Sequence, residues 1–159
     1  MYSEPDHGTT FKIYLPRVYE DADAMAAPGS VPAPRGGSET ILLVEDEGAV
    51  RQLARRVLEG AGYRVVEASG PQNALAMARD VRAPIHLLLS DVVMPGSGDV
   101  SLYDEMAVDR PSLRVLYMSG YADETMVQRG WLSTGVPYLA KPFTAHELVQ
   151  KVREVIDQS

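Results

Sequence analysis

The heptapeptide Ile41-Leu42-Leu43-Val44-Glu45-Asp46-Glu47 places four aliphatic residues in succession before three acidic ones. An uninterrupted apolar run is typical of a β-strand buried on both faces, as in a parallel sheet covered by helices. The acidic residues stand where that strand ends. Because strand ends on one edge of an open α/β sheet converge on a ligand site, this stretch predicts both the fold class and the position of the functional site.

The same periodicity continues along the chain, where short apolar runs alternate with apolar residues at helical spacing. The predicted strands are 41–44, 63–67, 85–90, 113–118 and 137–140. The predicted helices are 50–61, 71–81, 100–109, 123–132 and 145–156, the last marked by a capping box of Thr144 and Glu147. Five strands alternating with five helices predict an α/β fold with a doubly wound, five-stranded parallel sheet and right-handed crossovers. The common strand order for such a sheet is 2-1-3-4-5.

Composition limits the function classes. The 159 residues carry a net charge of -7, which argues against nucleic acid as a partner because no strongly basic surface is expected. The chain has no cysteine, so a thiolate metal site is excluded. No apolar run is long enough to span a bilayer, and the N-terminus lacks the pattern of a signal peptide. We expect a cytoplasmic protein piece without direct membrane contact.

The chain divides near residue 38. Residues 18–38 are rich in Ala, Pro, Gly and Ser and poor in large apolar side chains, which predicts a flexible linker. Residues 1–17 contain one alternating segment, 9–16, that predicts a single strand. Since one strand cannot fold alone, this segment is either the remnant of a preceding domain or an edge strand. Residues 39–159 form the main domain.

Polar residues at the strand ends supply a coherent chemistry. The strand order places Glu45, Asp46 and Asp91 side by side at the switch point, where their repulsion favours a hard cation such as Mg²⁺. Asp91 could then attack a phosphoryl group in line, with Lys141 neutralising its oxygens and Ser119 donating a hydrogen bond. Each signal alone has an ordinary explanation as a cap or a turn. Their joint occurrence at successive strand ends favours phosphotransfer.

Residues 39–158 resemble a response-regulator receiver domain of the flavodoxin-like (βα)5 type. The resemblance is carried by four motifs in order: residues 41–47, then Leu88-Leu89-Ser90-Asp91-Val92-Val93-Met94-Pro95, then Tyr117-Met118-Ser119-Gly120-Tyr121, then Tyr138-Leu139-Ala140-Lys141-Pro142-Phe143. It implies that Asp91 accepts phosphate from phosphohistidine. It also implies a Mg²⁺ site, with Mn²⁺ as an alternative, formed by Glu45, Asp46, Asp91 and the Val93 carbonyl.

The resemblance further implies that Ser119 and Lys141 sense the phosphoryl group and that Tyr138 is the switch aromatic. The Lys141-Pro142 bond is cis in the family. Residues 7–16 are similar to the last turn and strand of a histidine kinase ATP-binding domain, so the whole resembles the C-terminal piece of a bacterial hybrid sensor histidine kinase whose parent can be membrane-anchored. Expected partners are the phosphohistidine domain of a histidine kinase, a histidine phosphotransfer protein, or both.

We expect a phosphoacceptor module rather than an enzyme, with at most self-phosphorylation from small donors and autodephosphorylation. Three alternatives are less favoured. An aspartate-nucleophile phosphohydrolase would need an acid where Val93 stands. A flavin-binding module would need a phosphate-cradling loop where residues 45–47 are acidic. A degenerate receiver would lack one of the required residue types. His146-Glu147 superficially resembles a kinase phosphohistidine motif, but Glu147 already serves the helix cap.

Two departures from the family pattern are visible. Glu45 replaces the more common aspartate, and the glycine after Met94-Pro95 arrives one residue early, at Gly98, which predicts a tighter loop over the site.

Overall fold

The computed structural model describes residues 2–4, 8–10, 35–80, 84–92, 94, 102–120 and 135–158. The chain forms two compact units, Met1–Pro32 and Ala33–Ser159. In the first unit, β1 (Tyr2–Glu4) pairs antiparallel with β2 (Gly8–Thr10). The strand predicted over 9–16 is therefore found in part, with a partner that was not predicted, and its remainder lies outside the described residues.

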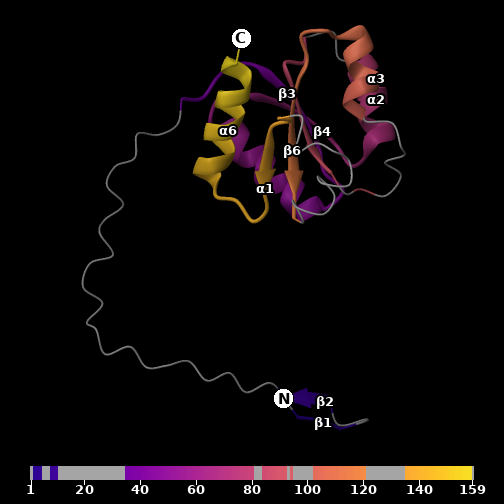
Figure 1. Cartoon of the computed structure of the whole chain (residues 1–159), viewed down its shortest axis with the longest axis vertical. Helices are drawn as coiled ribbons and strands as arrows, with labels where there is room; N and C mark the ends of the chain where they lie inside the picture. Colours follow the sequence, from indigo (N-terminus) through magenta and orange to yellow (C-terminus); the bar gives the residue numbers. More distant parts are fainter. Residues whose placement is uncertain are drawn as a thin grey trace, which may run out of the picture. The chain divides into compact units, whose positions relative to one another are not determined.

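The second unit is built on a parallel sheet of five strands (Figure 1). Its neighbours are arranged in the order β4-β3-β5-β6-β7. Counted within this unit the order is 2-1-3-4-5, which confirms the predicted doubly wound topology. The strands are β3 (Thr40–Val44), β4 (Arg64–Ala68), β5 (Leu87–Asp91), β6 (Arg114–Ser119) and β7 (Tyr138–Ala140).

Helices cover both faces of this sheet. In the part of the chain that the structure describes they are α1 (Gly48–Gly60), α2 (Pro71–Asp80), α3 (Leu102–Asp109) and α6 (Ala145–Asp157). The helices α1 and α6 share one face, and α2 and α3 share the other (Figure 1). The helix predicted over 123–132 lies outside the described residues.

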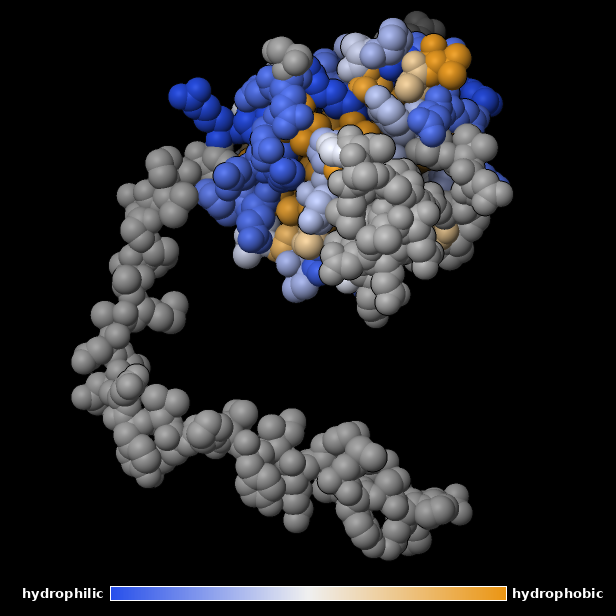
Figure 2. Space-filling model, viewed as in Figure 1, coloured by the Kyte–Doolittle hydropathy of each residue, from blue (hydrophilic) through white to orange (hydrophobic). Residues whose placement is uncertain are grey.

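The central strands are apolar because both of their faces are buried. All five residues of β3 are buried, and their side chains alternate between two cores. Ile41 and Leu43 pack with Leu58 of α1 and Val152 of α6. Leu42 and Val44 pack on the opposite face against α2 and α3. In Figure 2 the outer side of α6 is hydrophilic, and apolar residues are visible beneath it.

Strand ends differ from the prediction in a consistent direction. The strands predicted over 63–67, 85–90 and 113–118 each end one residue later than expected, at Ala68, Asp91 and Ser119. The ladder continues because backbone pairing does not require an apolar side chain: Asp91 pairs with Met118, and Ser119 pairs with Ala140. Two residues proposed for the site are therefore the last residues of strands, which restricts their backbone positions.

The segment that enters β3 packs closely against the domain. The amide of Gly37 donates to the carbonyl of Ala61 at 3.2 Å, across the turn that follows α1. Gly62 occupies that turn with φ +95°, a conformation that favours glycine. Beside it, Arg153 of α6 forms an ion pair with Glu39 at 2.9 Å. Close packing thus begins at Gly36 and Gly37, ahead of the first strand of the sheet.

None of the helices in the described part of the chain combines the length and the apolarity that crossing a membrane requires.

Candidate metal centre

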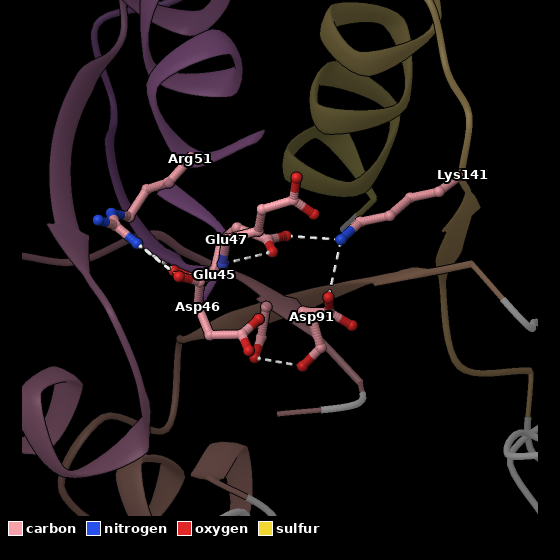
Figure 3. A network of polar contacts seen from close by, with 7 residues as sticks. Glu45, Asp46, Glu47, Arg51, Asp91 and Lys141 are labelled. Atoms are coloured by element: carbon pink, nitrogen blue, oxygen red, sulfur yellow. Dashed lines mark hydrogen bonds and ion pairs between the residues drawn. The ribbon is translucent and has the colours of Figure 1, made fainter. Parts of the chain in front are cut away.

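The carboxyl ends of four strands carry the predicted polar residues, and Figure 3 shows Glu45, Asp46, Asp91 and Lys141 gathered at this edge of the sheet. Asp91 ends β5 and Ser119 ends β6, whereas Glu45 and Asp46 directly follow β3 and Lys141 directly follows β7. Parallel strands place all their carboxyl ends on the same edge, so residues 96 positions apart in the sequence come into contact. The predicted convergence of the strand ends is present in the fold.

Lys141 is shared between two carboxylates. Its Nζ lies 2.6 Å from Oε2 of Glu45 and 2.7 Å from Oδ2 of Asp91. The Glu45 side chain is 1% exposed, the Asp91 side chain 12% and the Lys141 side chain 19%. Charge-assisted hydrogen bonds this short in a largely dry site are strong. Lys141 therefore holds the acceptor candidate and its acidic neighbour at a defined separation.

Burial and pairing change the proton affinities of this pair. Burial raises the pKa of Glu45, and the hydrogen bond from Lys141 only partly opposes it. Burial alone would lower the pKa of Lys141, but hydrogen bonds to Asp91 and Glu45 outweigh it and raise that pKa. The lysine is accordingly a fixed positive charge at neutral pH. Burial opposes the ionisation of Glu45, and the contact with Lys141 favours it.

A divalent cation fits the remaining charge. Glu45, Asp46 and Asp91 each offer one carboxylate oxygen, and these oxygens lie within 4.8 Å of one another. Three carboxylates face one ammonium, which leaves an excess of negative charge at the edge of the sheet. Oxygen ligands of this kind suit Mg²⁺ or Mn²⁺ better than softer metals. The donor set is therefore compatible with the expected ion.

Both carboxylate oxygens of Glu45 already accept hydrogen bonds. Oε1 of Glu45 accepts the amide hydrogen of Glu47 at 3.2 Å, while Oε2 accepts from Lys141. Asp46 is exposed. We infer that Asp46 is better placed than Glu45 to contact a cation directly.

Arg51 is a member of this region that the sequence did not single out. From the first turn of α1 its Nη1 donates to the backbone carbonyl of Glu45 at 2.6 Å and to that of Asp46 at 3.3 Å. Figure 3 shows it approaching the loop from the side opposite Lys141. A sequence signal existed, since a long cationic side chain four residues after Glu47 can reach back over the loop at the start of its own helix.

The remaining predicted positions fall into two groups. Ser119 is fully buried at the end of β6, and Tyr138 on β7 is 38% exposed. The Lys141-Pro142 bond is cis, as the resemblance implied. The Val93 carbonyl, Tyr121 and the loop through Gly98 lie outside the described residues.

The structure confirms the helix cap predicted for Glu147. The amide of Glu147 donates to Oγ1 of Thr144 at 3.2 Å, and Oε2 of Glu147 accepts the amide hydrogen of Thr144 at 2.7 Å. Glu147 thus closes the capping box at the start of α6. His86 also has a structural contact, because its Nδ1 accepts the amide hydrogen of Thr40 at 3.0 Å.

Comparison with known proteins agrees with this geometry. Residues 41–153 match the family model of the response regulator receiver domain. The chain is 34% identical over 163 residues to the sensor kinase CckA of Brucella abortus (strain 2308); the match covers 98% of this chain and 17% of the kinase. This chain thus spans about a sixth of that relative's length.

Two solved structures are also similar. The receiver domain of the hybrid histidine kinase CckA matches with a TM-score of 0.61 and 36% identity, covering 74% of this chain and 99% of that one. The response regulator TrrA of Thermotoga maritima, solved in complex with Mg(2+)-BeF, matches with a TM-score of 0.60 and 25% identity, covering 74% of this chain and 98% of that one.

Proposed function

This chain belongs to the response-regulator receiver family and is a phosphoryl-accepting domain of two-component phosphorelay signalling, and on that premise we propose that Asp91 is its acceptor. The observation that carries the proposal is the contact between Asp91 and Lys141 at 2.7 Å, at a sheet edge where Glu45 and Asp46 complete an acidic cluster. Among the described carboxylates of this cluster, Asp91 is the one that ends the central strand β5.

The proposed reaction is a transfer from a phosphohistidine nitrogen to an oxygen of Asp91. The new P–O bond forms as the P–N bond breaks, the electron pair returns to the imidazole of the donor, and Asp91 becomes an acyl phosphate. Bound Mg²⁺ would supply charge neutralisation for the phosphoryl oxygens, and Asp46 and Asp91, with Glu45 close behind, would hold it. Support for this ion comes from the donor set and from the Mg(2+)-BeF complex of TrrA.

The other residues have distinct proposed roles. Lys141 already contacts an oxygen of Asp91. After the transfer it would contact the phosphoryl oxygens and neutralise their negative charge. Ser119, buried at the end of the adjacent strand, would turn its hydroxyl toward the phosphoryl oxygens. Tyr138, on the neighbouring edge strand and partly exposed, would report this change at the surface. The chain would act as an acceptor and a switch and not as a kinase.

The acceptor assignment is tested by intact mass after incubation with Mg²⁺ and acetyl phosphate. We expect one phosphoryl adduct on the wild type and none on Asp91→Asn. The control is Asp109→Asn, which removes an exposed carboxylate at the end of α3 and should leave the adduct unchanged. An adduct that persists in Asp91→Asn would place the acceptor elsewhere. An adduct that survives a chelator would exclude the cation from the reaction.

We also propose that the parent protein is a hybrid histidine kinase. The match to CckA extends over 98% of the chain, whereas the CckA receiver structure covers 74% of it, so the similarity includes residues ahead of the receiver. In this proposal residues 1–17 belong to the end of a kinase domain, 18–38 link it to the receiver, and the protein faces the cytoplasm. Donor and recipient would be the kinase's phosphohistidine domain and a histidine phosphotransfer protein.

Partner identity is tested by phosphotransfer from purified, radiolabelled histidine domains. Transfer to the wild type that is lost in Asp91→Asn, and that is faster from a histidine kinase or phosphotransfer domain than from acetyl phosphate, would support the proposal. Equal rates from both kinds of donor would argue against a surface on this chain that recognises a histidine-containing partner domain.

A further inference from the structure

The loop between β3 and α1 carries two of the three carboxylates of the acidic cluster, yet it has little support from its own helix. The N-cap residue of α1, Glu47, makes no side-chain capping hydrogen bond, and the first turn contains no acidic residue. Side-chain caps commonly fix the entry of the chain into a helix. The cap therefore leaves the carbonyls of Glu45 and Asp46 available to another donor.

Arg51 is that donor. One guanidinium nitrogen, Nη1, bridges the carbonyl oxygens of Glu45 and Asp46, at 2.6 and 3.3 Å. Holding these two carbonyls fixes the orientation of the two peptide units that flank Asp46, and with it the direction in which the Asp46 side chain leaves the backbone. The amide of Arg51 also donates to the carbonyl of Glu47 at 2.9 Å, so the residue is anchored in the first helical turn.

We propose that Arg51 is a positioning residue for the cation site: it holds the loop so that the Asp46 carboxylate meets those of Glu45 and Asp91. The inference rests on the proposed function, in which Mg²⁺ binds at these carboxylates. Arg51 itself contacts neither the cation nor the phosphoryl group. Its guanidinium geometry matters, because a lysine ammonium is a point donor on a flexible chain.

The sign of the effect separates positioning from plain electrostatics. A positive charge near a cation site repels the cation, so removing Arg51 should tighten Mg²⁺ binding if charge were its only influence. If Arg51 positions the carboxylates, its removal should weaken binding instead. Arg55, one turn further along the same helix, offers a matched control. It pairs with Glu59 at 2.9 Å and with Glu67 at 3.5 Å, and neither is a member of the acidic cluster.

The experiment is a calorimetric Mg²⁺ titration of the wild type, Arg51→Ala, Arg51→Lys and Arg55→Ala, with urea unfolding as the check on folding. Loss of a residue that orients metal ligands typically weakens metal affinity by tenfold or more, so we expect a Kd about tenfold higher for Arg51→Ala. We expect Arg51→Lys to be weakened as well, although its charge is unchanged. Arg55→Ala should bind as tightly as the wild type or more tightly.

The outcomes distinguish the two levels of the proposal. A wild type that does not bind Mg²⁺ would overturn the cation site and, with it, the role of Arg51. A wild type that binds, together with Arg51→Ala and Arg51→Lys variants that bind equally well or better, would overturn the positioning role alone. Should Arg51→Ala fail to fold, the comparison of Arg51→Lys with the wild type at equal charge decides the question.

Discussion

Replacing Lys141 with methionine should destabilise the metal-free receiver strongly, because two carboxylates then lose their common counter-ion. The Glu45 side chain is 1% exposed and that of Asp91 12%, so water can replace little of the missing charge. Unit charges about 4 Å apart attract by about 4 kcal/mol at an effective dielectric constant of about 20. Removing one partner of a buried pair costs about 3–5 kcal/mol.

Since Lys141 is 19% exposed, we expect the lower end of that range, about 3 kcal/mol. For a domain of this size that is a fall in Tm of about 10 °C. The assay is urea unfolding at neutral pH with chelator. Lys151→Met is the matched control, since Lys151 pairs with Glu154 at 3.0 Å with side chains 31% and 50% exposed. That exposed pair should contribute less than about 1 kcal/mol.

The pH dependence has a definite sign. Burial raises the pKa of Glu45 above its ordinary value of 4.5, so stability falls as the pH rises above 4.5, and the loss is complete above the raised pKa of the folded state. Without the lysine this pKa rises further. The penalty of Lys141→Met should therefore be largest near neutral pH and shrink as the pH falls toward 4.5. In the wild type, the stabilisation by Lys141 persists below 10.5 and is lost as the pH rises through its raised pKa.

Two additional arms make the reasoning refutable. Adding Glu45→Gln to Lys141→Met removes the orphaned charge and should recover part of the loss. Saturating Mg²⁺ should stabilise Lys141→Met more than the wild type, because the cation replaces the missing positive charge. A loss for Lys141→Met no larger than that for Lys151→Met would show that the shared ion pair contributes little to the fold.

Further expected outcomes concern the frame around the site. Thr144→Ala removes the cap of α6 and should lower the free energy of unfolding by about 1 kcal/mol. The hydrogen bond from the Thr144 backbone lowers the pKa of Glu147 below 4.5. The stabilisation by the cap should therefore be present above pH 4.5 and be lost as the pH falls through the lowered pKa of Glu147. Glu147→Gln should abolish this dependence in unfolding measured across acidic pH. At Gly36 a Cβ would lie 1.7 Å from the carbonyl oxygen of Ala61, so Gly36→Ala should detach the segment that enters β3 and lower the free energy of unfolding by about 1 kcal/mol. Gly60 has open space around it, so Gly60→Ala should not destabilise the domain. Unchanged urea midpoints for both variants would contradict this.

The topology was predictable because burial leaves a direct trace in this sequence. A strand covered on both faces, such as β3, is mainly apolar, here over residues 41–44, and the alternation of such runs with helical spacing leaves few possible arrangements. The ends of the strands were less predictable. Apolar patterns report burial, whereas a ladder is made by backbone groups, so β5 and β6 continue through Asp91 and Ser119.

Part of the candidate site could likewise be predicted from the sequence, and part of it could not. The meeting of Glu45, Asp91 and Lys141 follows from their places at strand ends, which the sequence reveals. Which oxygen Lys141 contacts, and that it is shared, depends on side-chain geometry that no spacing encodes. Arg51 was missed because its spacing from Glu47 is a weak signal: the groups that it contacts are backbone carbonyls, and any residue type supplies those.

Sharing Lys141 between two carboxylates also bears on how the resting site is prepared for transfer. In the proposed reaction the negative charge of Asp91 would move outward onto the phosphoryl oxygens and grow, so Lys141 would lose one partner and gain a stronger one. In the resting site Glu45 lies 2.6 Å from the ammonium, and its side chain makes that contact from a buried position. The lysine then needs to shift only toward the new charge, without an ordering cost paid at the moment of transfer. The contacts that hold Lys141 between Glu45 and Asp91 in the resting domain would thus place its charge for the proposed transfer in advance.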